Sequence, residues 1–260
     1  MKIPIYQIDA FTNKLFGGNP AAVCPLEEWL SDERMQAIAA ENNLSETAFF
    51  VKNNNNRYDL RWFTPKIEID LAGHPTLATA YVIFEYIDKD LKAIEFETKS
   101  GILKVEREGE LLSMDFPSRP ASPSPAPDDL IRGLGKQPDE VFLSRDYLVV
   151  YDSEEKVRSL SPDMNDLLKV ESLGVIVTAP GKEVDFVSRF FAPRAGIPED
   201  PVTGSAHSTL IPYWAHRLDK KKLHAHQVSA RGGELFCEDR GDRVKIAGAA
   251  VTYLEGAIYL

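Results

Sequence analysis

The chain has 260 residues, 43% of them apolar, so it is long enough to bury two cores of ordinary domain size. Its formal net charge of −10 argues against a nucleic-acid partner, because phosphate binding needs a basic face. The chain has no apolar run as long as a membrane span, no signal-peptide core and only two cysteines, Cys24 and Cys237, so we expect a cytoplasmic protein without a membrane partner or a disulfide framework.

The first half of the chain predicts seven strands and two helices. Alternation over 3–9 indicates a strand, Ala21 to Cys24 a short buried one, and a capped helix begins after Ser31 and ends at Asn42-Asn43. Four asparagines, 53–56, separate two strand-like runs and indicate a hairpin. From His74 to about Tyr86 the pattern is apolar all round, which is typical of a buried helix. The expected strands are 3–9, 21–24, 46–52, 57–63, 92–98, 102–107 and 111–116.

The second half repeats this order. A hairpin turns at Pro180-Gly181, and a second apolar helix runs from near Ser205 to about Arg217. The expected strands are 173–179, 183–191, 223–229, 234–239, 243–248 and 250–259. We therefore expect an N-terminal lobe, 1–116, a semi-rigid proline-rich linker, 117–127, that cannot pair in a sheet, and a C-terminal lobe, 128–249. It stays open whether the last strand, near 250–260, returns to the first lobe.

An internal repeat supports two similar lobes. The segment Arg61-Trp62-Phe63-Thr64-Pro65-Lys66 matches Arg189-Phe190-Phe191-Ala192-Pro193-Arg194 at an offset of 189 − 61 = 128. Aligned on their histidines, the helix starts that follow have an offset of 207 − 74 = 133, which makes the second loop five residues longer. The fold class is therefore α+β: two pseudo-symmetric lobes, each a mixed sheet rolled around a central helix.

The two helix starts are candidate anion sites. Gly73-His74-Pro75-Thr76 and Gly204-Ser205-Ala206-His207 place small residues where free backbone N–H groups and the helix dipole favour a negative ligand. A single such start is more often an ordinary capped helix, but two matching copies favour a small carboxylate as the ligand.

The candidate acid–base groups lie close to these starts. Glu46 opens an apolar strand, where loss of hydration suits a general base. Asp200 precedes the second helix start, Asp70 stands at the matching point of the first loop, and His74 can carry a proton. Each residue also has an ordinary structural interpretation: a strand-end glutamate, an Asp-Pro turn, or a histidine held by the fold.

The sequence contains no motif for a metal, a nucleotide cofactor or a serine nucleophile. His224 and His226 share one face of a strand but no third metal ligand is evident, and Arg231 is either an anion contact or a surface turn residue. The chain has no dinucleotide fingerprint, no phosphate-binding loop, no zinc-protease motif and no serine-nucleophile elbow. We therefore expect no metal and no cofactor.

Several motifs, taken together, resemble the PhzF-like family, named for a phenazine-biosynthesis isomerase. They run in the family's order from about residue 8 to 215: Asp9-Ala10-Phe11, Gly18-Asn19-Pro20-Ala21, Asn43-Leu44-Ser45-Glu46-Thr47, Arg61 to Pro65, Ala72-Gly73-His74-Pro75-Thr76, and Glu199-Asp200-Pro201-Val202-Thr203-Gly204-Ser205-Ala206-His207. This set is specific for the family and not for a substrate.

The resemblance implies the diaminopimelate-epimerase-like fold, cofactor-independent proton transfer and a homodimer. The family's catalytic glutamate falls on Glu46, its histidine on His74 and its aspartate on Asp200. Its helix-start serine falls on Ser205, so we expect the substrate, a small carboxylate held between the lobes, to contact Gly73, Thr203, Gly204 and Ser205.

Two alternatives remain. A two-base amino-acid epimerase or racemase shares the fold, but those enzymes place a cysteine in each helix-start loop, where this chain has Ala72-Gly73 and Asp200-Pro201. A non-catalytic interaction protein on the same fold is the third interpretation.

Overall fold

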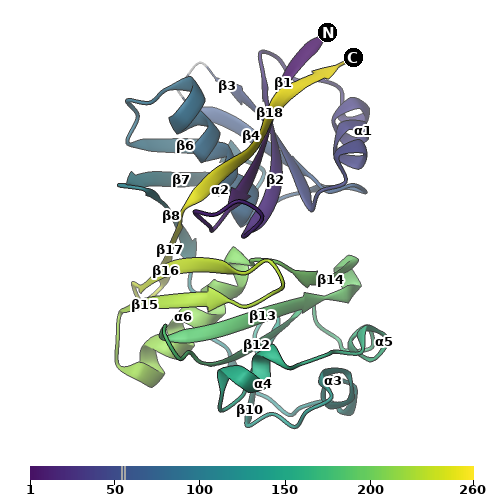
Figure 1. The fold of residues 1–260 in the computed structure, drawn as a ribbon, viewed down its shortest axis with the longest axis vertical. Helices are drawn as coiled ribbons and strands as arrows, with labels where there is room; N and C mark the ends of the chain where they lie inside the picture. Colours follow the sequence, from purple (N-terminus) through teal and green to yellow (C-terminus); the bar gives the residue numbers. More distant parts are fainter. Residues whose placement is uncertain (54, 56) are drawn as a thin grey trace. The chain divides into compact units, whose positions relative to one another are not determined.

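The computed structural model describes residues 1–53, 55 and 57–260, so Asn54 and Asn56 of the expected hairpin turn lie outside the described residues. The chain forms two compact units (Figure 1). The first contains Met1–Asp115 together with Ala247–Leu260, and the second contains Phe116–Ile246. No helix in the described part of the chain is both long and apolar enough to cross a membrane.

The first unit is a mixed sheet with two α-helices, and apart from the short strand β5 its elements match the strands and helices expected from the sequence. These elements are β1 (Lys2–Ala10), β2 (Asn19–Leu26), α1 (Asp32–Asn42), β3 (Glu46–Lys52), β4 (Tyr58–Phe63), β5 (Glu68–Ile69), α2 (Gly73–Val82) with a π-helical turn (Ile83–Ile87), β6 (Ala93–Thr98), β7 (Gly101–Glu108), β8 (Leu111–Pro117) and β18 (Ala250–Tyr259).

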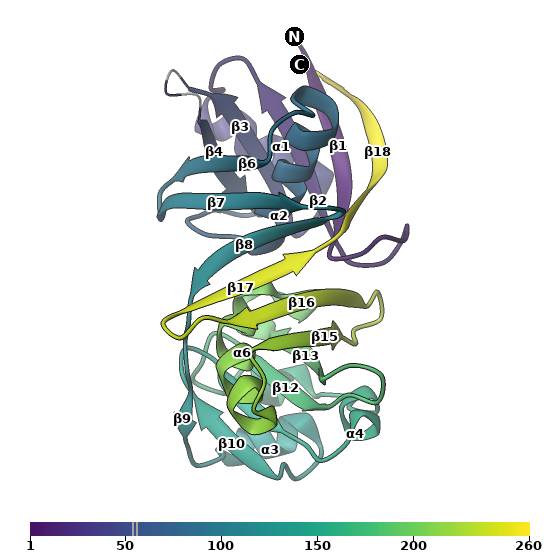
Figure 2. The ribbon, with the colours of Figure 1, turned by 90° about the vertical axis from the view of Figure 1, so that its left-hand side faces the viewer.

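Strand pairing in this unit explains where its helices lie. The strands β2 and β3 are parallel and are joined through α1, and β4 and β6 are parallel and are joined through α2. The pairs of β1 with β18 and β2, of β4 with β3 and β5, and of β7 with β6 and β8 are antiparallel. The last strand, β18, pairs with β1 from Lys2↔Tyr259 to Ala10↔Ala250, and the two run side by side in Figures 1 and 2. The chain ends therefore meet in one unit.

The second unit is also a mixed sheet with helices. Its elements are β9 (Ser122–Pro123), α3 (Asp128–Leu134), β10 (Glu140–Leu143), β11 (Tyr147–Val150), α4 (Glu154–Arg158), α5 (Met164–Leu167), β12 (Val175–Pro180), β13 (Phe186–Ala192), a 3-10 turn (Pro193–Ala195), β14 (Ile197–Asp200), α6 (Gly204–Leu218), β15 (Lys222–Gln227), β16 (Gly233–Asp239) and β17 (Arg243–Gly248). Parallel pairs again accompany the helices, β11 with β12 across α4 and α5, and β13 with β15 across α6.

The proline-rich segment between the halves differs from expectation. We predicted that it cannot pair in a sheet, and this is wrong: Ser122 and Pro123 form β9 opposite Leu143 and Phe142 of β10. The segment pairs only at the sheet edge, where proline needs no donor on its outer side.

Both central helices are buried, as the apolar pattern predicts. Residues 74–80 of α2 are all buried, and α6 buries Trp214 and most of its first two turns. Neither helix has acidic residues in its first turn, whereas α1 has Ser31 as cap followed by Asp32 and Glu33. The central helices are therefore held by packing rather than by the charges that stabilise surface helices.

The internal repeat forms the same substructure in each unit. Arg61 of β4 makes two hydrogen bonds to Glu68, of 2.7 and 2.9 Å, and Arg189 of β13 makes two to Glu199, also of 2.7 and 2.9 Å. Each guanidinium also lies over the ring two residues further on, at 5.2 Å for Phe63 and 4.9 Å for Phe191. The hydrogen bonds from Arg61 lower the pKa of Glu68 to about 2.

The structure corrects how the two helix starts correspond. The helices begin at Gly73 and Gly204, an offset of 204 − 73 = 131, so the second loop is three residues longer rather than five. His74 therefore corresponds to Ser205, and His207 corresponds to Thr76. Both of the latter hydrogen-bond the carbonyl four residues earlier, Thr76 to Ala72 and His207 to Thr203.

The expected correspondence of Asp70 with Asp200 is also wrong, by one residue. Trp62 pairs with Ile69, and its repeat partner Phe190 pairs with Asp200. Asp200 therefore corresponds to Ile69. Because strand side chains alternate between faces, Asp70 is displaced from the position of Asp200 by one residue.

Candidate active site

The loop between β1 and β2 leads into the strand that pairs with Glu46. The buried Asp9 carboxylate accepts a hydrogen bond of 3.0 Å from the backbone N–H of Phe16. Gly18 has φ of +61°, and a Cβ there would lie 2.1 Å from the carbonyl oxygen of Ala10, so only glycine fits. This loop leads into β2, whose Ala21 pairs with Glu46. The motifs near residues 9–21 and 43–47 are thus neighbours in the fold.

Glu46 and His74 lie together in the first unit. Glu46 is the first residue of β3, His74 is the second residue of α2, and each is only 7% exposed. The His74 Nε2 and Glu46 Oε2 atoms are 3.1 Å apart. A buried carboxylate and imidazole at this distance can share and exchange a proton.

The start of α2 lies at the same place. Ala72 precedes the helix in an extended conformation, and among the described residues no side chain caps this end. The first backbone N–H groups of an α-helix have no acceptor within the helix, and Pro75 in this first turn carries no N–H group. The positive end of the helix dipole favours negative charge beside His74 and Glu46.

The start of α6 is held by a network of polar side chains. Gln227 of β15 donates 2.8 Å from Nε2 to the Asp200 carbonyl and accepts 2.8 Å from the Thr203 N–H. The Thr203 hydroxyl donates to Asp200 Oδ2. Ser229 donates 2.7 Å to the carbonyl of Pro201. The loop that carries Asp200, Thr203, Gly204 and Ser205 is therefore fixed before the helix begins.

A cation that sequence reasoning missed contacts this helix start. The Arg145 guanidinium donates 3.2 Å to Ser205 Oγ and also pairs with Asp146, which is 2% exposed. A second cation is near: burial, and then the positive charge of Arg145, lowers the pKa of Arg119. A guanidinium group beside a helix N-terminus favours an anion. No motif marks Arg145, because it lies between short strands sixty residues before Ser205.

His207 has no exposed nitrogen and is fully buried. Burial lowers its pKa to about 4, although its contact with the Thr203 carbonyl opposes this. The Nδ1 atom lies 2.9 Å from that carbonyl oxygen, which only accepts, so Nδ1 carries the proton. His207 is a neutral part of the core.

The remaining candidates are the two cysteines, Asp70 and Arg231. Cys24 and Cys237 are buried, and burial raises the pKa of the Cys24 thiol to about 12 and raises that of Cys237 further still. Asp70 is exposed, and its carbonyl accepts from Ser100. Arg231 lies half-buried in the turn between β15 and β16. The structure thus assembles two groups of predicted residues, Glu46 with His74 in one unit and Asp200 with Thr203 to Ser205 in the other.

Comparison with known proteins agrees with this architecture. The profile of the phenazine biosynthesis-like protein family matches residues 8–256. An uncharacterized isomerase of Pseudomonas aeruginosa is 52% identical over 260 residues, covering 100% of both chains. A crystal structure of a phenazine biosynthesis protein of the PhzF family from Enterococcus faecalis is 48% identical, with a TM-score of 0.98 over 100% of both chains.

The fold extends to more distant proteins. A hydroxyproline epimerase from Agrobacterium vitis is 10% identical, with a TM-score of 0.64 over 99% of this chain and 92% of that one, a likeness of fold alone. The sequence expectation of an α+β protein with two pseudo-symmetric lobes is confirmed. Because the family profile matches nearly the whole length of the chain, the chain belongs to the phenazine biosynthesis-like (PhzF) family. This family includes isomerases and has the diaminopimelate-epimerase-like fold.

Proposed function

We propose that this chain is a cofactor-independent isomerase that moves a proton between two atoms of a small carboxylate-bearing metabolite. The observation that carries the proposal is the buried pair of Glu46 and His74, with 3.1 Å between their facing atoms. Burying two titratable groups at a helix start is costly for a fold, and such pairs cluster at functional sites. Glu46 takes the substrate proton, and His74 positions the carboxylate or shares that proton.

The second unit supplies recognition of the substrate anion in this proposal. Ser205, beside Arg145, and the N–H groups at the start of α6 offer donors to a carboxylate. Gly73 at the start of α2 and Thr203 and Gly204 at the start of α6 allow close approach of a ligand to the backbone. We propose that one substrate contacts both units, with Asp200 as a second carboxylate that handles a proton.

The internal repeat disfavours an epimerase with two equivalent glutamate bases. Because Thr47 pairs with Phe63 and Val175 pairs with Phe191, Glu46 corresponds to the residue before Val175, Gly174. The second unit thus has no copy of the base, and a Cβ at Gly174 would lie 2.3 Å from the Phe190 ring. A racemase that uses thiols on both faces of the substrate is also disfavoured, since burial keeps both cysteines protonated.

A test needs no knowledge of the physiological substrate. The protein is incubated in deuterated water with a panel of small unsaturated and hydroxylated carboxylates, and exchange is followed by proton NMR. We expect deuterium to enter at the isomerised carbons of at least one compound. Glu46→Gln keeps the shape and removes the base, so it should slow exchange by about 10²–10⁴-fold.

The matched control is Glu41→Gln, an exposed glutamate at the end of α1, which should exchange at the wild-type rate. Exchange accompanied by racemisation would favour the epimerase. Binding without exchange would favour the interaction protein. Wild-type exchange by folded Glu46→Gln would remove Glu46 from the mechanism.

A further inference from the structure

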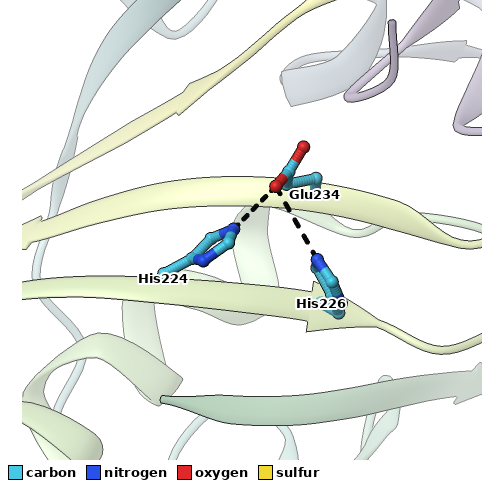
Figure 3. A group of neighbouring side chains, drawn as sticks. All are labelled: His224, His226 and Glu234. Carbon is cyan, nitrogen blue, oxygen red and sulfur yellow. Dashed lines mark hydrogen bonds and ion pairs between the residues drawn. The ribbon is translucent and has the colours of Figure 1, made fainter. Parts of the chain in front are cut away.

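Two neighbouring strands of the second unit bring three metal-binding side chains to one face. Along β15 the residues alternate, so Leu223, Ala225 and Gln227 are buried while His224 and His226 face outward. In the antiparallel register His226 pairs with Glu234 of β16. Glu234 also faces outward, because the next residue, Leu235, is buried. Figure 3 shows the two imidazoles and the carboxylate pointing toward one another.

The donor atoms of these three side chains lie close to a common point. His224 Nε2 is 2.7 Å from Glu234 Oε1, and His226 Nε2 is 3.8 Å from the same oxygen. One ligand atom from each residue lies within 4.8 Å of the others. A tetrahedral Zn²⁺ with bonds of about 2.0–2.1 Å separates its donors by about 3.3 Å. These two separations lie on either side of that value, and all three donors lie within 4.8 Å of one another, so rotation of the side chains can bring them around one ion.

The strand pair also fixes these side chains. The His224 ring stacks on Phe236, with 4.8 Å between ring centroids and 5° between planes. The backbone N–H of His224 donates 2.8 Å to Asp185. A surface ion pair needs one histidine for one glutamate, whereas here two imidazoles face a single carboxylate oxygen.

We propose that His224, His226 and Glu234 bind a divalent transition-metal ion of the Zn²⁺ or Co²⁺ class. Two imidazoles and a carboxylate suit such ions and not Mg²⁺ or Ca²⁺, which prefer oxygen ligands alone. The three side chains are 35–42% exposed, so water or a ligand completes the coordination. A metal here joins β15 to β16 beside Gln227, whose side chain on the opposite face holds the Asp200 loop.

The sequence alone did not predict this site. The third ligand lies eight residues after His226 and beyond a turn, so only the register of β15 on β16 places it opposite. The inference is independent of the proposed proton transfer, since it assigns the metal to no step of that reaction.

The test measures metal binding directly. Full-length protein without a polyhistidine tag is treated with chelator, and Zn²⁺ and Co²⁺ are then titrated by calorimetry and by competition with a chromophoric chelator. We expect one ion per chain and a visible Co²⁺ spectrum of a four- or five-coordinate site. His226→Gln and Glu234→Gln should each weaken binding by more than about 100-fold, because even outer-shell changes cost 10–100-fold.

The matched control is His216→Gln, an exposed histidine on α6, which should bind as the wild type does. Circular dichroism and denaturant unfolding confirm that each variant folds, and His224→Gln replaces any variant that does not. Absence of stoichiometric binding would overturn the proposal. So would equal loss of binding in His216→Gln, or wild-type affinity in both His226→Gln and Glu234→Gln.

Discussion

At the scale of single residues, equivalent positions in the two units carry different chemistry. His74 and Ser205 are both the second residue of a central helix, yet His74 faces Glu46 and Ser205 contacts Arg145. Gly174 stands where the first unit has Glu46. In the proposed function this asymmetry places the base Glu46 in one unit, and anion recognition together with the second carboxylate Asp200 in the other, on two copies of one fold.

His207, the fourth residue of α6, has a structural role. Its pKa is lowered from 6.5 to about 4 by burial, so the folded protein takes up this proton only below about pH 4, whereas the unfolded chain takes it up below 6.5. The contribution of His207 to the free energy of unfolding should therefore be fully present above pH 6.5 and be lost as the pH falls toward 4. From pH 7.5 to 4.5 the loss from this group is about 2–3 kcal/mol.

Urea unfolding of the wild type and of His207→Gln at both pH values isolates this contribution, because other groups titrate alike in both proteins. His207→Gln should lack about 2–3 kcal/mol of the wild-type pH dependence, while His216→Gln on the exposed face of the same helix should keep it. Identical pH dependence in wild type and His207→Gln would mean that the buried imidazole does not stay neutral.

At the scale of secondary-structure elements, an arginine–glutamate pair ties each β-hairpin to the strand that leads into the central helix. The two pairs have the same bond lengths but different surroundings. Arg189 also donates 3.1 and 2.9 Å to the carbonyls of Val157 and Leu160, and its side chain is 12% exposed. Arg61 instead has a second acidic partner, Asp32, whose side chain is 70% exposed.

Substitution should therefore cost more in the second unit. Arg189→Met leaves Glu199 and two carbonyls without their donor, and it should lower the free energy of unfolding by about 3–5 kcal/mol. Arg61→Met should cost about 1–3 kcal/mol, since its second acid is hydrated. Denaturant unfolding of both variants, with Arg240→Met on an exposed turn as control, checks the order. Equal losses for Arg61→Met and Arg189→Met would contradict the role of the two carbonyls.

Most elements were predictable because local signals agree with the fold. Alternation, turn residues and two fully apolar helices predicted most of the strands and both central helices within a few residues. The correspondence of His74 with His207 was wrong, because a helix start depends on backbone conformation at Ala72 and Thr203 and not on the residue types that follow. Arg145 was missed because its contact with Ser205 depends on tertiary packing, which the periodicity of the sequence does not report.

At the scale of the whole molecule, the two units differ in how the chain builds them. The second unit is one continuous stretch, whereas the first needs Ala247–Leu260 to complete it. β1 lies between β2 and β18, so without β18 one full edge of β1 would be unpaired. Contacts between residues so far apart in sequence form slowly, because the long loop must close before they contribute stability.

Separate expression of the pieces should reveal this difference. Residues 116–246 should fold alone, with one cooperative unfolding transition, because that stretch contains its own core and the strands from β9 to β16. Residues 1–115 should aggregate or stay unfolded, because the open edge of β1 offers a template for other chains. Added in trans, a peptide of residues 247–260 should restore folding by pairing with β1, as measured by circular dichroism and by protection of the β1 amides from hydrogen exchange.

A peptide of the same composition in scrambled order is the control, because it cannot place Ile258 against Ile3 in the native register. A stable, monomeric fragment 1–115 without the peptide would show that β18 is not needed to complete the first unit.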